Sequence, residues 1–287
     1  MRIGFVLPME PSEGAARGSP PLAIRLAERA EALGFDSLWV YDHFFSNMPG
    51  ERPRIPVHEA WTIVSAVAAR TSRVEIGQLV TCTAYRPPAL LAKMAVTADA
   101  VSGGRLTLGV GAGWHFEEYR AFGYPFENRA GRFEESMTII APLVRGETVT
   151  FAGRYHAVDG AVLLPFERRI PILIAAKGPR MLRLTARFAD AWNTAWFGMP
   201  NHVLRTRLAD MDAALEAERR DPATLRRTVG IDAREPDGPG EDSAVLVEEL
   251  PRAIEAYEAL GVDDLILGFE SATERTLDRI ERALAGR

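Results

Sequence analysis

Strand-like and helix-like segments alternate along the whole length of this chain, and this alternation limits the folds open to it. Each of the strand-like runs is short and apolar, and each is followed by a segment with helical spacing of apolar residues. The runs lie at about 2–7, 37–41, 73–81, 105–112, 170–176, 191–196, 226–233 and 263–269. This order predicts a parallel α/β sheet.

Eight strand–helix units in 287 residues match the count and size of a (β/α)₈ TIM barrel, which we predict as a single domain over residues 1–287. The rival fold is an open doubly wound sheet, whose first strand is usually followed by G-x-G-x-x-G. Here the stretch is LPMEPSEGAARG, which lacks that pattern. The alternating segment 148–164 predicts a small inserted β-hairpin, with turns at Gly153 and Gly160. The segment 244–260 predicts a helix.

Composition excludes several classes of function. The chain is 47% hydrophobic and 25% charged, and no apolar run approaches the roughly 20 residues that span a bilayer. Its beginning lacks the pattern of an export signal, and the single cysteine fits a reducing compartment. The net charge of -5 argues against nucleic-acid binding. We therefore expect a cytoplasmic protein that binds neither membrane nor nucleic acid, and the scattered histidines predict no metal site.

The active site of a TIM barrel lies at the carboxyl ends of its strands, so the residues that follow each strand are the candidates. Asp42 and His43 come directly after the second strand. One interpretation is structural, with Asp42 as the N-cap of a short helix. The other is chemical: at a barrel mouth the imidazole can exchange protons with a bound heterocycle, and Asp42 can orient it.

Glycine and aromatic residues follow the fourth strand, in GVGAGWHFEEYRAFG (109–123). Gly111 and Gly113 would leave room for a planar ligand, and Trp114 could form a wall beside it. The alternative is a short helix whose buried face includes Tyr119 and Phe122. Glutamates 117 and 118 can be site acids or, as is more frequent, surface charges.

The turn after the fifth strand, AAKGPR (175–180), has the features of a phosphate site. Gly178 permits close backbone approach at a helix N-terminus, Pro179 suits the first helical turn, and Lys177 and Arg180 add positive charge. A plain strand-to-helix turn with two solvated bases is the alternative.

Four stretches together resemble the bacterial luciferase-like superfamily of flavin- and deazaflavin-dependent oxidoreductases: GFDSLWVYDH, RPPALLAKMAVTADAVSGGRLTLGVGAGW, EEYRAFG and AAKGPRMLRLTARFADAWN. The resemblance implies a homodimeric barrel with the cofactor ring in its mouth, and His43 with Asp42 as the catalytic pair near the ring. It also implies that a bulge after the third strand supports the ring, in some members through a non-prolyl cis peptide. The implied bulge residues are Val80, Thr81, Cys82 and Thr83, and the implied phosphate loop is Ala175, Ala176, Lys177, Gly178 and Pro179.

The form AAKGPRML resembles the phosphate loop of enzymes that use coenzyme F420, so the resemblance favours F420-dependent hydride transfer to or from a small organic substrate. An FMN-dependent monooxygenase that uses oxygen is the alternative, and a non-catalytic flavin-binding barrel is a more remote one. A phosphate-handling isomerase would rest on Lys177 and Arg180 alone. The loop 44–58 could grip an anionic group or be a solvated lid, and the loop 234–243 departs from the family pattern.

Overall fold

Parallel strands close into a barrel in the computed structural model, which describes residues 1–10, 19–164 and 168–285. Each strand pairs with its neighbours in chain order, β12 pairs with both β1 and β10, and β9 pairs with β10 to complete the ring. The barrel strands are β1 (Arg2–Val6), β2 (Ser37–Val40), β3 (Glu75–Gln78) with β4 (Thr81–Cys82), β5 (Leu106–Gly111), β8 (Ile172–Ala175), β9 (Ala191–Phe197), β10 (Arg226–Arg234) and β12 (Asp264–Gly268). The predicted TIM barrel is confirmed.

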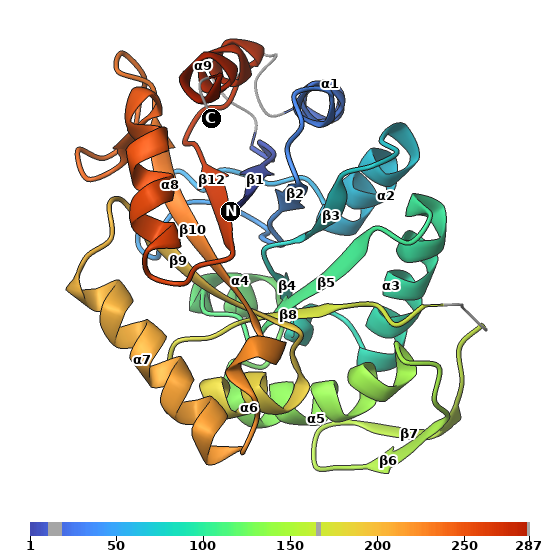
Figure 1. Ribbon diagram of the computed structural model, residues 1–287. Helices are drawn as coiled ribbons and strands as arrows, with labels where there is room; N and C mark the ends of the chain where they lie inside the picture. The colour runs from blue at the N-terminus through green and yellow to red at the C-terminus, as the bar shows by residue number, and fades with distance from the viewer. Residues whose placement is uncertain (11–18, 165–167, 286–287) are drawn as a thin grey trace.

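Helices form a ring outside the strands (Figure 1). They are α1 (Pro20–Ala32), α2 (Ala60–Arg70), α3 (Pro88–Ser102), α4 (Phe116–Phe122), α5 (Arg129–Leu143), α6 (Pro179–Phe188), α7 (His202–Ala217), α8 (Leu250–Glu258) and α9 (Glu274–Leu284), with 3₁₀ turns η1 (Thr83–Tyr85), η2 (Pro222–Thr224) and η3 (Val247–Glu249). Within the described ranges, no helix has the length and apolar character needed to cross a membrane.

The predicted hairpin is present as β6 (Val149–Ala152) and β7 (Ala157–Ala161), which pair in antiparallel fashion (Figure 1). Its turn begins at Gly153, whose N–H donates to the carbonyl of His156 at 2.9 Å. The second predicted turn is wrong, because Gly160 lies inside β7. Gly160 has a φ of 59°, so a positive φ marks an irregular strand here and not a reversal of the chain.

The helix predicted over 244–260 is shorter than expected. Val245 and Leu246 form β11, a short strand parallel to the end of β10, and α8 begins only at Leu250. The periodic apolar residues are present, but β10 extends beyond the barrel and offers unpaired backbone groups. Pairing with that free edge satisfies the backbone of Val245, and a β-branched side chain suits a strand.

Tryptophan fills the interior of the barrel. Trp39 on β2 is fully buried in an inner cluster with Leu173 and Ile266 from other strands. Glycines make room for it: a Cβ atom on Gly4 would lie 3.0 Å from its Nε1, and one on Gly77 would lie 2.7 Å from its ring. The barrel is therefore closed at the level of this indole ring.

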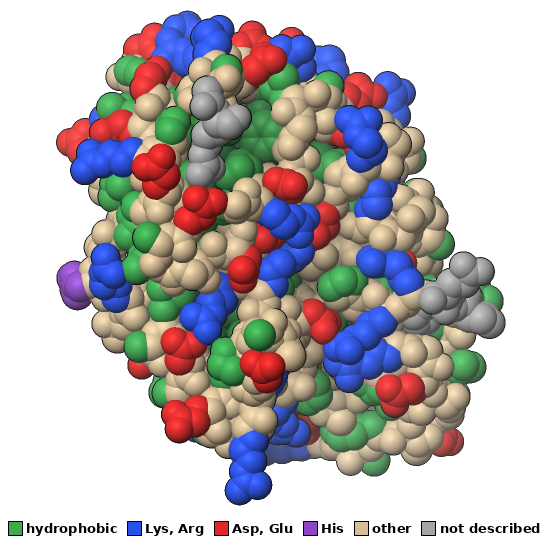
Figure 2. All heavy atoms as spheres, viewed as in Figure 1, with side chains coloured by type: hydrophobic (Ala, Val, Ile, Leu, Met, Phe, Trp, Pro, Cys, Tyr) green, Lys and Arg blue, Asp and Glu red, His purple; other side chains and the backbone are tan. Residues whose placement is uncertain are grey.

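Charged residues gather at the amino-terminal rim of the barrel. Glu75 pairs with Arg2 at 2.9 Å and with Arg226 at 2.8 Å, and the fully buried Asp264 lies 3.5 Å from Arg226. Burial raises the pKa of Asp264 to about 6, although both arginines oppose the shift. In Figure 2 acidic and basic side chains are interspersed over the visible face of the molecule. We assign no catalytic role to the ionic cluster at this rim, because barrel active sites lie at the other rim.

Candidate active site

The carboxyl ends of the parallel strands meet at one rim, which we call the barrel mouth. Residues 42 and 43 follow β2, the 80–83 segment follows β3, and residues 175–180 span the end of β8 and the start of α6. Segments far apart in the sequence are thus brought to the same rim. This arrangement is the one that a shared cofactor site requires.

A bulge interrupts the third barrel strand between β3 and β4. The Leu79–Val80 peptide is cis, and the chain then resumes pairing with β5. A Cβ atom on Gly111 of β5 would lie 2.8 Å from Cγ2 of Val80 and 4.0 Å from the carbonyl oxygen of Ala175, so the bulge, β5 and β8 lie side by side. The Thr83 hydroxyl donates to the Gly111 carbonyl at 3.3 Å. These contacts define an inner wall of the mouth.

Thr81 and Cys82 are enclosed beneath this wall. Thr81 is fully buried, and its hydroxyl has no hydrogen-bond partner among the described residues. Burial raises the pKa of the Cys82 thiol to about 12, so the thiol stays protonated at neutral pH. Cys82 can therefore contribute its backbone and its shape to the site, but not a reactive thiolate.

The room expected beside the two glycines after β5 is filled by the protein itself. Val80 occupies the space beside Gly111. Gly113 has a φ of 74°, and a Cβ atom there would lie 2.0 Å from the Tyr119 hydroxyl and 2.7 Å from the Cys82 sulfur. Both glycines are thus needed for internal packing. Trp114 is 51% exposed and borders the mouth, with its ring centroid 5.7 Å from that of His43.

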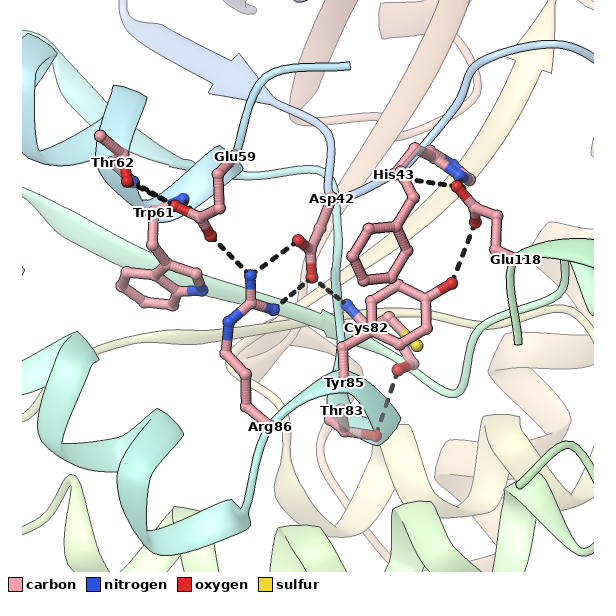
Figure 3. Close-up of polar contacts among 12 residues, drawn as sticks. Asp42, His43, Glu59, Trp61, Thr62, Cys82, Thr83, Tyr85, Arg86 and Glu118 are labelled. Atoms are coloured by element: carbon pink, nitrogen blue, oxygen red, sulfur yellow. Dashed lines mark hydrogen bonds and ion pairs between the residues drawn. The ribbon is translucent and has the colours of Figure 1, made fainter. Parts of the chain in front are cut away.

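The sequence left Glu118 open as a site acid or, as is more frequent, a surface charge, and the second alternative is wrong. Glu118 lies on the predicted short helix α4 and is fully buried. Its carboxylate lies 2.9 Å from Nδ1 of His43 and accepts a hydrogen bond from the Tyr85 hydroxyl at 2.9 Å (Figure 3). It also accepts from the backbone N–H groups of Phe44 and Phe45. No helix starts at residue 42, so the N-cap interpretation of Asp42 is wrong.

Hydrogen bonds keep Glu118 ionised despite its burial. Burial alone would raise the pKa of this carboxyl, but the bonds from His43 and from the two amides outweigh burial and lower it. The His43 side chain is 24% exposed, and its Nε2 has no hydrogen-bond partner among the described residues. The arrangement is a fixed carboxylate, an oriented imidazole and one ring nitrogen free for a ligand.

Asp42 has different partners from those expected. Its carboxylate accepts two hydrogen bonds from Arg86, at 2.7 and 3.0 Å, and one from the backbone N–H of Cys82 at 3.0 Å (Figure 3). The carboxylate that bonds to His43 is therefore Glu118 and not its sequence neighbour Asp42. Adjacent residues on an extended segment point in different directions, which sequence adjacency alone does not reveal.

The predicted phosphate turn places an open helix N-terminus beside two cations. Gly178 is the N-cap of α6, and a Cβ atom there would meet nothing within 4 Å. Lys177 is exposed, and Arg207 of α7 donates to the Thr194 hydroxyl at 2.8 Å. Neither cation forms an ion pair with any described residue. Although the Lys177 side chain reaches solvent, partial desolvation and, after it, the positive charge of Arg207 lower its pKa. Uncompensated positive charge at an open helix N-terminus fits a phosphate group.

Arg180 contributes less than expected to this phosphate site, because it pairs with Glu134 of α5 at 2.8 Å. Arg207 lies near Lys177 at this phosphate site, and sequence reasoning did not identify it as part of the site. It lies on a helix, ten residues after the end of β9. In the sequence its position is that of an ordinary charged residue on the solvent-exposed face of an amphipathic helix. Pro179 occupies the first turn of α6, as expected, and Ala176 is buried at the end of β8.

Both unusual loops are anchored to neighbouring helices. In the 44–58 loop, Arg52 and Arg54 pair with the buried Glu117 of α4 at 3.0 and 3.5 Å. These two arginines are thus already compensated, which weakens the idea that they grip an anionic ligand. In the 234–243 loop, Glu235 and Asp237 pair with Arg279 of α9 at 3.2 and 2.9 Å.

The fold and the mouth define a class of protein. This TIM barrel has a bulged third strand, a histidine–carboxylate pair and a positively charged helix N-terminus at one rim. Flavin- and deazaflavin-dependent oxidoreductases are built in this way. Residues 1–267 match the model of the luciferase-like monooxygenase family, and the chain belongs to that family.

Curated relatives and solved structures agree with this assignment. The chain is 36% identical over 183 residues to the F420-dependent glucose-6-phosphate dehydrogenase of Amycolatopsis mediterranei, covering 62% of this chain but only 54% of that relative. It is 30% identical over 276 residues to the protein of the same name from Kineococcus radiotolerans, covering 93% of this chain and 80% of the relative. An F420-dependent secondary alcohol dehydrogenase in complex with an F420-acetone adduct superposes with a TM-score of 0.83, covering 99% of this chain and 98% of that chain, at 22% identity. The last comparison shows a shared fold.

Proposed function

We propose that this protein is a coenzyme F420-dependent oxidoreductase that transfers hydride to or from a small organic alcohol or carbonyl compound. The observation that carries the proposal is the distribution of charge around the mouth: a fixed carboxylate–imidazole pair on one side and an uncompensated cation pair at an open helix N-terminus on another. The names of the two relatives support F420 over FMN. When bound, the cofactor would supply the two-electron hydride chemistry.

Residues of this chain would hold the cofactor at both ends. Lys177, Gly178 and Arg207 suit its phosphate group, because they combine positive charge with open space. The inner wall of Val80, Gly111 and Ala175 suits the back of a flat ring. The same wall would accept FMN, so an FMN-dependent monooxygenase is the second candidate, and the name of the matching family favours it.

His43 and Glu118 would manage the proton that accompanies hydride transfer. With its Nδ1–H donated to Glu118, a neutral His43 presents Nε2 as an acceptor. In alcohol oxidation, the hydroxyl proton would pass to Nε2 while hydride leaves the carbon. The resulting imidazolium would be stabilised by the ionised carboxylate of Glu118. In carbonyl reduction the same proton would return to the substrate oxygen.

Fluorescence titration tests the proposal. The protein is titrated with F420 and FMN, each oxidised and reduced, and we expect saturable quenching with F420. Saturable binding of FMN alone would favour the monooxygenase, and binding of neither would refute a cofactor-dependent enzyme. A second measurement compares His43→Ala with His202→Ala, a control at an exposed histidine of α7. Loss of turnover with retained binding in the first variant alone supports catalysis, whereas unchanged turnover supports a non-catalytic carrier.

We also propose that the chain forms a homodimer, as the family resemblance implies, and that α3 lies in its interface. This helix exposes Leu90 and Val101, which are 47% and 51% accessible. Two large apolar side chains on one largely apolar helix provide a surface that association would cover. Sedimentation equilibrium is expected to give twice the chain mass, and the monomer mass would refute the dimer.

A further inference from the structure

Arg86 joins two carboxylates behind the mouth. It lies between η1 and α3, and its side chain is only 14% exposed. Its guanidinium donates two hydrogen bonds to Asp42 and one, at 2.7 Å, to Glu59 (Figure 3). Glu59 in turn caps α2 by accepting from the backbone N–H groups of Trp61 and Thr62. Arg86 thus connects the end of β2 to the start of α2.

The carboxylate of Asp42 is shared between Arg86 and the bulge. Its Oδ2 accepts from Nη1 of Arg86 at 2.7 Å and from the Cys82 backbone N–H at 3.0 Å. Cys82 belongs to β4, which pairs with β5 alone among the described strands, whereas β2 pairs with β3. The Asp42 side chain therefore ties the Cys82 amide to the chain after β2, and a second tie is the backbone hydrogen bond from the Leu79 N–H to the Val40 carbonyl at 2.7 Å.

A bidentate guanidinium is suited to this task. Asp42 is buried, and a buried carboxylate needs charge-assisted partners to keep one orientation. Two parallel bonds from Arg86 fix the plane of the carboxylate, and a lysine ammonium could not fix it. The bulge carries Val80 onto the inner wall beside Gly111. A shift of the Cys82 amide would therefore move the surface on which a ring rests.

We infer that Arg86 is a positioning residue: by clamping Asp42 onto the Cys82 amide, it fixes the bulge that supports the cofactor ring. This inference rests on the proposed function. It also assigns Asp42 a positional role, because the hydrogen bonds of its carboxylate are directed to Arg86 and to the bulge. Proton transfer is left to His43 and Glu118.

The test compares Arg86→Lys with Arg105→Lys. Arg105 is a matched control, because its guanidinium makes five hydrogen bonds, to Ser102, Thr71, Val74 and Ala68, at the opposite, amino-terminal end of β5. For each folded variant, the dissociation constant of the cofactor that the wild type binds and the visible spectrum of the bound form are measured. We expect R86K to weaken binding at least fivefold and to shift the spectrum. We expect R105K to lower the melting temperature while leaving both unchanged.

Asp42→Asn tests the same link from the other end and does not depend on R86K being folded. If Arg86 acts through Asp42, D42N shifts the spectrum in the same direction as R86K. The double variant then binds the cofactor with the same affinity as whichever single variant has the lower affinity. Binding within twofold of wild type and an unshifted spectrum in folded R86K or D42N would overturn the inference while leaving the proposed function intact. Failure of the wild type to bind F420 or FMN would overturn both.

Discussion

Replacing Lys177 by methionine should weaken binding of a phosphorylated cofactor without affecting the ring. Methionine keeps the length of the side chain and removes its charge. A hydrogen bond to a charged group contributes about 1.5–3 kcal/mol, and solvent screening at this exposed position reduces the effect to about 1–2 kcal/mol. The expected result is a 5- to 30-fold weaker dissociation constant, at roughly 1.4 kcal/mol per tenfold.

The assay compares FMN with riboflavin, which has the same ring and no phosphate, and compares F420 with its core lacking the phosphate. Quenching titrations are run at low and high salt, because screening weakens the contribution of an exposed charge. Lys93→Met is the matched control, since Lys93 is the other lysine of the sequence and is exposed on α3. We expect K177M to affect only the phosphorylated ligands. An equal loss for riboflavin and FMN would refute the placement of the phosphate at α6.

Three further predictions concern single substitutions. Glu118→Gln removes the charge that stabilises the imidazolium, so we expect kcat/KM to fall about 10- to 100-fold while cofactor affinity stays within about twofold; a parallel loss of both would contradict the assigned role. The pKa of Asp264 is raised from 3.8 to about 6 in the folded protein, so stability is highest below pH 4 for this group and falls as pH rises through 6. Urea unfolding should show Asp264→Asn to be more stable than wild type by up to about 3 kcal/mol at pH 7 and similar to it at pH 4, and no pH-dependent difference would refute this. Gly113→Ala places a methyl group 2.0 Å from the Tyr119 hydroxyl at a φ of 74° and should lower the free energy of unfolding by about 3 kcal/mol; a loss below about 1 kcal/mol would contradict the packing argument.

The order of strands and helices could be predicted because it depends on local periodicity. Buried parallel strands are apolar on both faces, and runs such as SLWV and LTLGVG are bounded by turn residues. Where the prediction failed, a distant partner decided the structure. Val245 became a strand because the end of β10 lies beside it, and that neighbour is not visible within a window of the sequence. Local periodicity gave an unbroken third strand, and only the family resemblance implied the bulge at Val80 that splits it.

The site could be predicted in part for a similar reason. His43 and Lys177 directly follow strands, so topology alone brings them to the mouth. Glu118, Arg86 and Arg207 lie on helices or in a turn, and their partners are 75, 44 and 13 residues away in sequence. A charged residue on an amphipathic helix has the same pattern whether it faces water or a buried imidazole. One usable signal was the acidic pair 117–118 between aromatic residues, which is unusual for a solvated face.

The indole of Trp39, packed against Gly4 and Gly77, fills the interior of the barrel beneath the mouth. A flat cofactor lying on the wall at Val80 would occupy the deeper part of the mouth, and the substrate would have to settle above it. For the enzyme proposed above, this stacking would impose an order on binding: the cofactor would arrive first and depart last, and substrate alone would have little affinity for the protein without its cofactor.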